Sequence, residues 1–558
     1  MTAFSPISAV PGLLSLVLAF ACSSQEGAPA AAGGSSPAGG AAAAGQTNMG
    51  GVTGASGAPG TAGSPGVGTA GSGGAVGGGN NGNGAGAGGM SSGGTAGSSG
   101  TTGAGGGAAG GPPAVCAAPT VSLTGADAVV GKLIQFNDNG GWCWYQDERA
   151  VVDTKSNKLV IASEASGGSR NGHQEAVIYN LADGTKSAVA TLGTAITSDV
   201  DDHDAPALLV RPDGKYVALW SSHRADCFSR WSIYDGTAWS AEKKYDWGPN
   251  GCPWPTAATN KVTYSNPWYV GTSILAGVRS IGTDPAVISS DDNGETWKFY
   301  GRLMSSKQVG YVAGYFKYWG NNTDRIDFVG TEAHPRDADT SLYHGYIKDG
   351  MVYTSTGTVI DSSLKDASAS SSNSKDITLY TPVFKTGSTL GGVKLEHAWN
   401  HDIVRYADGT IAILGQARVS GTGSDDPDKR MLYFRFDGTS WKSTYLVKAG
   451  KKLYADEQDY TGLGALVPDD PSTIYISTPY DPNTDMMGTG KREIWRGTTC
   501  DNGATFKWTP VTANSTKDNI RPIVPKWDAN HTALLWMQGT YSTAQKFATA
   551  IVGTITGL

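Results

Sequence analysis

From about residue 116 to the C-terminus, apolar and polar positions alternate in short runs separated by polar turns. This pattern is typical of half-buried β-strands, and hardly any segment carries the 3.6-residue period of a helix. Seven pairs of runs enclose a turn and are predicted to be hairpins. Their turns fall at Ser156, Asp213, Gly271, Asn322, Asp408, Asp470 and Asp528.

The turns recur at intervals of about 59 residues, except for one interval of about 86 that holds a serine-rich insertion around residues 368–374. A repeat of this length fits a four-stranded unit that buries its faces only by stacking on its neighbours. Seven such units predict an all-β fold, a seven-bladed β-propeller of four-stranded antiparallel blades.

Turn motifs between the outer strands support the same fold. Residues 290–297 read Ser-x-Asp-x-Gly-x-Thr-Trp, a complete Asp box, and residues 499–506 are a close variant. Aromatic-Asp-Gly turns followed by Trp occur at residues 234–239 and 436–441. In an Asp box the Asp and Gly serve turn geometry. We therefore assign these motifs no chemistry.

The N-terminal region has a different composition. The apolar run at residues 13–20 is too short for a membrane span and fits a signal peptide over residues 1–22. Cys22 follows Ala21 as in a lipoprotein cleavage box, so we expect lipidation there, with a plain secretory signal as the alternative. Residues 23–115 are mostly Gly, Ala and Ser and are predicted to be a disordered tether. We therefore expect an exported protein, either a cell-surface or outer-membrane lipoprotein or a secreted one, with the propeller at residues 116–558.

Deleting residues 23–113 is expected to leave the melting temperature of the propeller nearly unchanged, because the tether has no apolar core to contribute. Differential scanning calorimetry of the chain with and without this segment checks the prediction. A large fall in melting temperature would show that the tether packs on the propeller.

Charge and cysteine content narrow the choice of partners. The net charge is −7 and no basic run occurs, which argues against nucleic-acid binding. With Cys22 lipidated, five cysteines remain, and Cys227 with Cys252 is the best candidate disulfide. No cysteine or histidine spacing predicts a zinc site, although the sequence does not exclude a structural calcium or zinc ion. We expect a monomer whose only contact with a membrane is the lipid anchor.

Two of the hairpins carry reactive side chains at their open ends. His203 and His223 are equidistant from the turn at Asp213, so they are expected to be cross-strand neighbours with Cβ atoms roughly 5 Å apart. The next hairpin places Tyr264 opposite Arg279 in the same way. These four side chains form a candidate set for proton transfer and anion binding. The alternative is that each histidine is a hydrogen-bonded structural residue.

Several motifs resemble the BNR-repeat seven-bladed propeller polysaccharide lyases, which include ulvan lyases and rhamnosyl-glucuronate lyases. The matching segments are residues 142–150, 201–206, 222–223, 315–318, 324–326, 334–337 and 519–525. The resemblance implies that His203, His223, Tyr264 and Arg279 are catalytic. It also implies a second active-site tyrosine, which Tyr315 fits best, with Tyr318 as the alternative.

Other residues lie near predicted strand ends that could face the same opening. We predict a substrate-binding role for them, with a structural ion pair or packing role as the alternative. These candidates are His334, Arg336, Trp399, His401, Arg418 and Arg521. For Arg521 the alternative is that it braces the last blade.

The resemblance implies β-elimination next to a uronic acid in an acidic polysaccharide. An arginine would neutralise the carboxylate, while histidine and tyrosine would serve as base and acid, and this chemistry requires no cofactor. A glycoside hydrolase of sialidase or rhamnosidase type is an alternative, although an early Arg-Ile-Pro typical of sialidases is absent. A non-catalytic glycan-binding propeller is a third interpretation, because propellers serve many functions.

Overall fold

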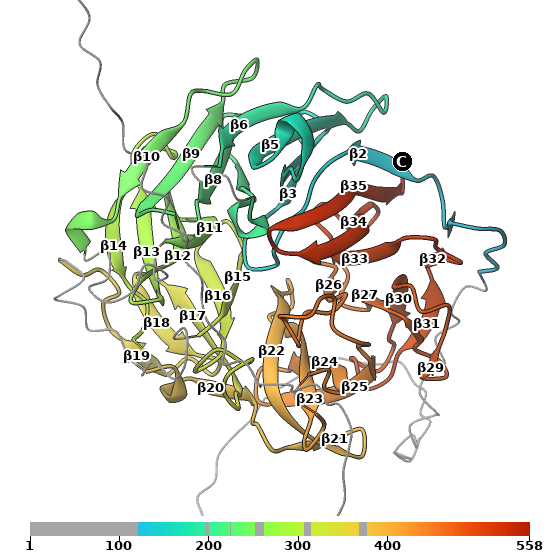
Figure 1. The fold of residues 1–558 in the computed structure, drawn as a ribbon. Helices are drawn as coiled ribbons and strands as arrows, with labels where there is room; N and C mark the ends of the chain where they lie inside the picture. The colour runs from blue at the N-terminus through green and yellow to red at the C-terminus, as the bar shows by residue number, and fades with distance from the viewer. Residues whose placement is uncertain are drawn as a thin grey trace, which may run out of the picture. The chain divides into compact units, whose positions relative to one another are not determined.

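Seven antiparallel sheets surround a common centre in the computed structural model, and they confirm the predicted seven-bladed β-propeller (Figure 1). The structure describes residues 121–195, 200–223, 225–250, 262–305, 314–367, 376–423 and 425–558. The predicted signal peptide, Cys22, the tether and Cys252 lie outside these ranges. Within them, no helix is long and apolar enough to cross a membrane.

Five of the seven sheets have the predicted four strands. The first blade holds β3 (Ala150–Asp153), β4 (Lys158–Glu164), β5 (His173–Asn180) and β6 (Ala190–Thr194). The second holds β7 (Ala207–Val210), β8 (Tyr216–Ser221), β9 (Phe228–Tyr234) and β10 (Lys243–Asp246). The third holds β11 (Thr263–Val270), β12 (Ser273–Ile281), β13 (Asp284–Ser290) and β14 (Lys298–Arg302). The sixth holds β26 (Gly464–Leu466), β27 (Thr473–Thr478), β30 (Glu493–Thr498) and β31 (Lys507–Pro510).

The fourth and fifth blades are larger than predicted. The fourth has six strands, β15 (Phe316–Gly320), β16 (Arg325–Gly330), β17 (Leu342–Lys348), β18 (Met351–Thr354), β19 (Val359–Asp361) and β20 (Thr381–Phe384). The fifth has β21 (Thr389–Leu390), β22 (Val393–Arg405), β23 (Ile411–Val419), β24 (Lys429–Phe436) and β25 (Trp441–Lys448). The long interval in the repeat therefore adds β19 and β20 to the fourth blade and adds β21 beside the first strand, β22, of the fifth.

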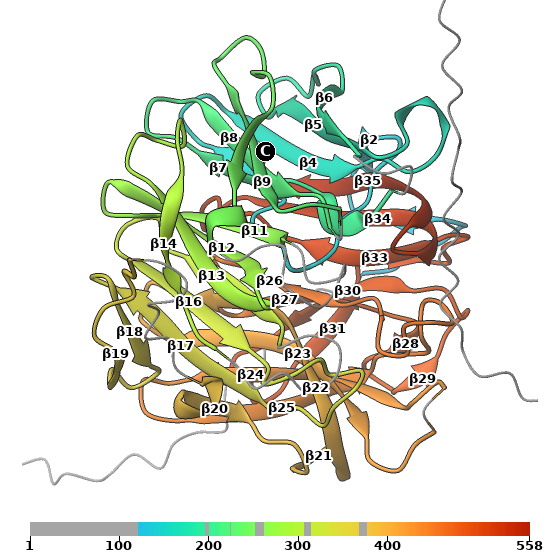
Figure 2. The same cartoon turned by 60° about the vertical axis from the view of Figure 1, so that its left-hand side comes forward.

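The seventh blade joins the two ends of the propeller. Strands β33 (Asp518–Ile523), β34 (Thr532–Thr543) and β35 (Lys546–Thr556) pair in order, and β2 (Ile134–Asn137) adds to β35. Figure 2 shows β2 beside β35 from a second direction. Because the first and last parts of the propeller share one sheet, the ring closes without an open edge.

Short elements complete the described chain. Strand β1 (Ala128–Val129) pairs with β32 (Thr512–Ala513), and β28 (Tyr480–Asp481) pairs with β29 (Met486–Met487). The 3₁₀ helices are η1 (Gly168–Arg170), η2 (Asp202–Asp204), η3 (Gly248–Asn250) and η5 (Ile377–Leu379).

All seven inner hairpins turn where the sequence predicted. The Asp boxes also form, because Asp292 accepts a hydrogen bond from the Thr296 amide at 2.9 Å and Asp501 accepts one from the Thr505 amide at 2.9 Å. They connect β13 to β14 and β30 to β31. The inner strands are covered on both faces by neighbouring blades, and every residue of β8 is buried. The open ends of these rigid inner hairpins carry the candidate site.

The cysteines have different states. Cys227 and Cys500 are each in a disulfide, whereas Cys143 is a free, buried thiol. Cys252 is outside the described residues, so its pairing with Cys227 stays a prediction.

Candidate active site

His203 and His223 lie side by side at the open end of the second blade, as their equal distance from the turn predicted. Their rings stack with centroids 4.4 Å apart and an angle of 21° between planes. His203 belongs to η2, just before β7, and His223 follows β8, so neither is a strand residue. The ladder between β7 and β8 keeps the predicted register, which brings the two extensions together.

Tyr264 and Arg279 are also close, but they are not the cross-strand pair that we predicted. Strands β11 and β12 pair in the predicted register from Asn266 onward, and a bulge before that residue makes Thr263 the partner of Arg279. Tyr264 has a φ of 63°, the left-handed conformation that such an irregularity imposes. The bulge turns the phenol ring so that the Arg279 guanidinium carbon lies 4.8 Å from its centroid.

Tyr315 joins these residues from the segment before β15. The guanidinium carbon of Arg279 is 5.3 Å from the Tyr315 ring centroid, and its Nη2 is 3.4 Å from Nε2 of His223. The His203 and Tyr264 rings are 5.6 Å apart. We call His203, His223, Tyr264, Arg279 and Tyr315 the His–Tyr–Arg cluster.

The two histidines of the cluster have opposite charge preferences. Burial lowers the pKa of His223 to about 4, and the charges of His203 and Arg279 add to this effect, while Asp201 opposes it. Burial also opposes the charge on His203, but neighbouring Tyr264 and Asp201 outweigh it and hold the pKa of His203 well above its ordinary value. Tyr264 is uncharged at neutral pH, so Asp201 supplies the negative charge there. At neutral pH His203 is therefore an imidazolium and His223 is neutral.

Tyr264 keeps its proton at neutral pH. Burial raises its pKa well above 10, although the neighbouring charges of His203 and Arg279 act in the opposite direction. The Tyr264 hydroxyl is buried and donates no hydrogen bond to any described residue. At neutral pH it therefore carries a proton that it could donate, and it is not in the anionic form that could accept one.

His334 and Trp399 extend the cluster on the side of the fourth and fifth blades. The His334 ring lies edge-on to Tyr315 at 4.9 Å and edge-on to Trp399 at 5.3 Å. Burial, followed by the charge of Arg336, lowers the pKa of His334 well below its ordinary value. His334 is therefore a neutral residue that packs against the aromatic wall.

Arg336 and Arg418 are fixed by carboxylates. Arg336 pairs with Glu457 at 2.7 Å. Arg418 binds Asp459 through Nε at 2.7 Å and Nη2 at 2.6 Å. The same Asp459 accepts the indole N–H of Trp399 at 2.9 Å. Arg418 therefore positions the Trp399 side of the site.

Arg521 braces the last blade, the second of the two roles considered for it. It donates to the Trp142 carbonyl at 2.5 Å and forms an ion pair with Asp202. Its guanidinium lies 4.3 Å from the Tyr541 ring, and Tyr541 in turn donates to Asp202 at 2.6 Å. Arg521 thus ties β33 to η2, which holds His203.

Of two further predicted binding residues, His401 lies apart from the cluster, whereas Tyr318 lines a small cavity together with Tyr264, Arg279 and Tyr315. His401 is buried in β22, and burial followed by the charge of Lys317 lowers its pKa to about 3. Tyr318 is buried in β15 where Gly277 of the neighbouring blade leaves room for its ring. In the described part of the chain, neither side chain makes a hydrogen bond, ion pair or ring contact with the cluster. Both are buried within their strands.

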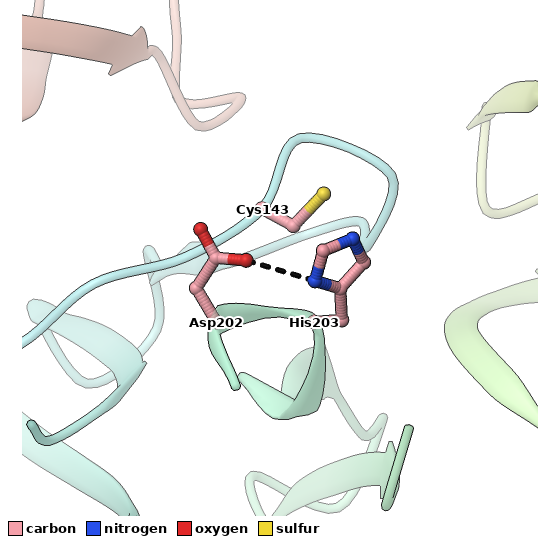
Figure 3. A group of neighbouring side chains, drawn as sticks. All are labelled: Cys143, Asp202 and His203. Carbon is pink, nitrogen blue, oxygen red and sulfur yellow. Dashed lines mark ion pairs between the residues drawn. The ribbon is translucent and has the colours of Figure 1, made fainter. Parts of the chain in front are cut away.

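Two groups of side chains are close enough to share a cation. Cys143, Asp202 and His203 form one group (Figure 3), and Asp201, His203 and His223 form the other. Asp202 already binds Arg521 and Tyr541 and lies 2.9 Å from Nδ1 of His203. Both oxygens of Asp201 bind imidazole Nδ1 atoms. Because these carboxylates are compensated by protein donors, we interpret both groups as hydrogen-bond networks and assign no metal to them.

Several residues near the cluster were not predicted. Asp201 contacts both histidines, and its position in the run Asp201-Asp202-His203 was the available signal. Tyr145 packs 4.8 Å from Tyr315 and 5.4 Å from Tyr264. Glu457 comes from a loop without any periodic pattern, so no sequence signal indicated it.

The cavity at the cluster is much smaller than two cavities at the opposite ends of the inner hairpins. A cavity of about 10 Å³ adjoins Tyr264, Arg279, Tyr315 and Tyr318. Cavities of about 550 Å³ and 210 Å³ open among the turns at the other ends of the inner hairpins, where both are lined by Trp319 and Lys526. The reactive side chains do not line these larger cavities.

The site and fold define a seven-bladed propeller with a buried His–Tyr–Arg cluster at one end. No family model and no curated protein matches the chain. Among solved structures, it is similar to a polysaccharide lyase of family PL25, an ulvan lyase bound to -[GlcA(1-4)Rha3S]-, with a TM-score of 0.55 and 13% identity over 75% of this chain and 95% of that chain. This likeness shows a shared fold.

Two other solved structures match more weakly. The polysaccharide lyase Uly1 matches with a TM-score of 0.44 and 12% identity over 77% of this chain and 100% of that chain. An α-L-arabinofuranosidase from Fusarium graminearum matches with a TM-score of 0.36 and 12% identity over 62% of this chain and 91% of that chain.

Proposed function

We propose that this protein is a polysaccharide lyase that cleaves a uronate-containing glycan, such as an ulvan-like or rhamnose–glucuronate polymer, by β-elimination. One observation carries the proposal: the neutral Nε2 of His223 lies 3.4 Å from the Arg279 guanidinium, next to the protonated Tyr264. A proton acceptor, a carboxylate-binding cation and a proton donor therefore share one buried site. The fold shared with an ulvan lyase is consistent with this function.

The difficult step is removal of the C5 proton, which is weakly acidic while the neighbouring carboxylate is charged. In the proposed complex, the two-pronged guanidinium of Arg279 binds this carboxylate and stabilises the negative charge that develops on it. The imidazolium of His203, whose ring stacks on His223, adds a second positive charge. Burial of the cluster strengthens both interactions because little water screens them.

Two proton transfers complete the reaction. His223 accepts the C5 proton through Nε2, and the electrons of the C5–H bond form the C4=C5 double bond. The bond between C4 and the glycosidic oxygen breaks, and Tyr264 donates its proton to the departing oxygen. One proton is taken and one is given, so the reaction consumes no water. We propose that Tyr315, His334, Arg336, Trp399 and Arg418 shape the adjoining sugar-binding surface.

A glycoside hydrolase is the second candidate, and Glu457 is the observation that favours it. Burial raises the pKa of Glu457 to about 7, while the charge of Arg336 opposes this shift. A carboxylic acid that is partly protonated near neutral pH is what a hydrolase uses as general acid. A hydrolase of this kind also uses a second carboxyl group. Asp201, the carboxylate nearest to the histidines, already binds both of them. The lyase therefore remains the better supported function.

Product absorbance separates the two functions. The full-length protein is incubated with a panel of uronate polysaccharides, and both ultraviolet absorbance and reducing ends are followed. A lyase releases an unsaturated uronate that absorbs in the ultraviolet together with each new reducing end. New reducing ends without absorbance would establish a hydrolase, and binding without either signal would establish a glycan-binding propeller.

The pH dependence of kcat/KM should reflect the low pKa of His223. Because the base form of His223 persists down to a pH of about 4, kcat/KM is expected to fall only as the pH drops through that value. Burial is the main cause of this low pKa, the charges of His203 and Arg279 lower it further, and Asp201 opposes them. A profile on the best substrate, with circular dichroism at each pH as a folding control, checks the prediction. An acid limb near 6.5, the ordinary histidine value, would contradict it.

We also propose that the protein is exported and held at the cell surface through lipidated Cys22. The apolar run and the cysteine after it support this location, and fractionation of cells expressing wild-type and Cys22→Ser chains would test it.

A further inference from the structure

One carboxylate holds both histidines of the cluster. Oδ1 of Asp201 lies 2.5 Å from Nδ1 of His203, and Oδ2 lies 2.9 Å from Nδ1 of His223. Asp201 also caps η2, because its Oδ1 accepts the His203 amide at 3.2 Å. Capping of η2 accounts for the contact of Oδ1 with the His203 amide. It does not account for the contact of Oδ2 with His223, which is 22 residues away in the sequence.

The hydrogen bonds fix where the protons of the imidazoles sit. An ionised carboxylate only accepts hydrogen bonds, so both Nδ1 atoms must carry hydrogen. The two imidazoles reduce the pKa of Asp201 well below its ordinary value despite burial, which keeps it ionised. On His223 the remaining nitrogen, Nε2, faces Nη2 of Arg279, which has only hydrogens to offer. Nε2 of His223 is therefore the nitrogen with a free electron pair.

Asp201 is itself held from two directions. The Gln545 amide, in the turn between β34 and β35, donates to Oδ2 at 2.8 Å. The Asp201 amide donates to Glu164 at the end of β4 at 3.1 Å. Asp201 is therefore anchored through its backbone by the first blade and through its carboxylate by the last, while the carboxylate orients the two histidines of the second.

We propose that Asp201 is a positioning residue that fixes both imidazoles with hydrogen on Nδ1 and so presents the unprotonated Nε2 of His223 to the substrate. This inference rests on the proposed lyase function and adds a residue to its machinery. It assigns Asp201 no contact with substrate. A merely structural cap would hold η2 without controlling which nitrogen of His223 carries hydrogen.

The test compares Asp201→Asn with wild type. Asparagine keeps the size of the side chain and caps helices well, so η2 should form. Its amide group donates hydrogen, however, and can satisfy only one of the two Nδ1–H groups. Asp376→Asn is the matched control, because Asp376 caps η5 in the same way, accepting the Thr378 amide at 2.8 Å, and bonds to no histidine among the described residues.

Two readouts distinguish positioning from stability. Nitrogen-15 NMR of histidine-labelled, substrate-free protein identifies the protonated nitrogen of each of the eight histidines, with single histidine variants giving the assignments. Wild type should show His223 with hydrogen on Nδ1 only, and Asp201→Asn should move that hydrogen to Nε2. On the best uronate substrate, kcat should fall on the order of a hundred-fold or more while KM changes little.

Each result has a clear meaning. The tautomer change together with the loss of kcat, both absent in Asp376→Asn, supports the inference. A wild-type spectrum with hydrogen on Nε2 of His223 overturns it without any variant, even if Asp201→Asn does not fold. A tautomer change without loss of kcat also overturns it and leaves the lyase function intact. Failure of wild type to cleave any substrate would instead refute the proposed function, while the substrate-free spectra still decide the orientation of the histidines.

Discussion

Arg279→Lys is expected to remove most of the lyase activity while the propeller stays folded. Lysine keeps the positive charge but loses the two parallel N–H donors that hold a carboxylate in its plane. The charge that develops on the uronate during proton removal then lacks one well-placed donor. Loss of one such donor costs about 2–4 kcal/mol of transition-state stabilisation, roughly a 30- to 1,000-fold fall in kcat.

Arg496→Lys is the matched control for this substitution. Arg496 lies on β30 and donates to the Thr473 hydroxyl at 3.3 Å, away from the cluster. Initial rates of unsaturated product are compared on the best substrate, with circular dichroism to confirm folding. Near-wild-type turnover by folded Arg279→Lys would mean that another cation neutralises the carboxylate, and Arg336 would be the next to test.

His223→Gln should reduce kcat by roughly a hundred- to ten-thousand-fold, the range that a positioned acid–base group contributes. Glutamine can still donate a hydrogen bond to Asp201 and fill much of the ring's volume. Its amide nitrogen has no basic electron pair, however, and its oxygen is a far weaker base than imidazole. The variant should therefore bind substrate with nearly unchanged KM and fail at removal of the C5 proton.

His531→Gln controls for the loss of a histidine as such. His531 stacks on Trp527 at 4.7 Å and bonds to Asp528 in the turn before β34, at the far end of its hairpin. It should keep wild-type activity. If His223→Gln and His531→Gln were equally active, the base would have to be another group, with Tyr264 the first alternative.

Much of the fold could be predicted because the repeat is local. Each hairpin contains its own turn signal and apolar strands, so the seven turns and the closeness of His203 and His223 follow from spacing alone. The ladder between β7 and β8 is regular, which is why counting residues from Asp213 worked.

Other features depend on contacts that spacing does not encode. A single bulge in β11 shifts Tyr264 out of the expected pairing with Arg279. The extra strands of the fourth and fifth blades arise where no repeat signal exists. Glu457 meets Arg336 only because two distant loops converge, and Asp201 reaches His223 across a hairpin. His401 resembled a site residue because it follows Trp399 at a strand end, but its strand directs it into the interior.

The mass of the products from one defined uronate oligosaccharide tests the central claim most directly. β-Elimination splits the substrate without adding water, so the masses of the two products should sum to the mass of the substrate, and one product should be unsaturated. His223→Gln and Arg279→Lys should form this same pair far more slowly. Products whose masses sum to the substrate plus one water would contradict a lyase and establish hydrolysis.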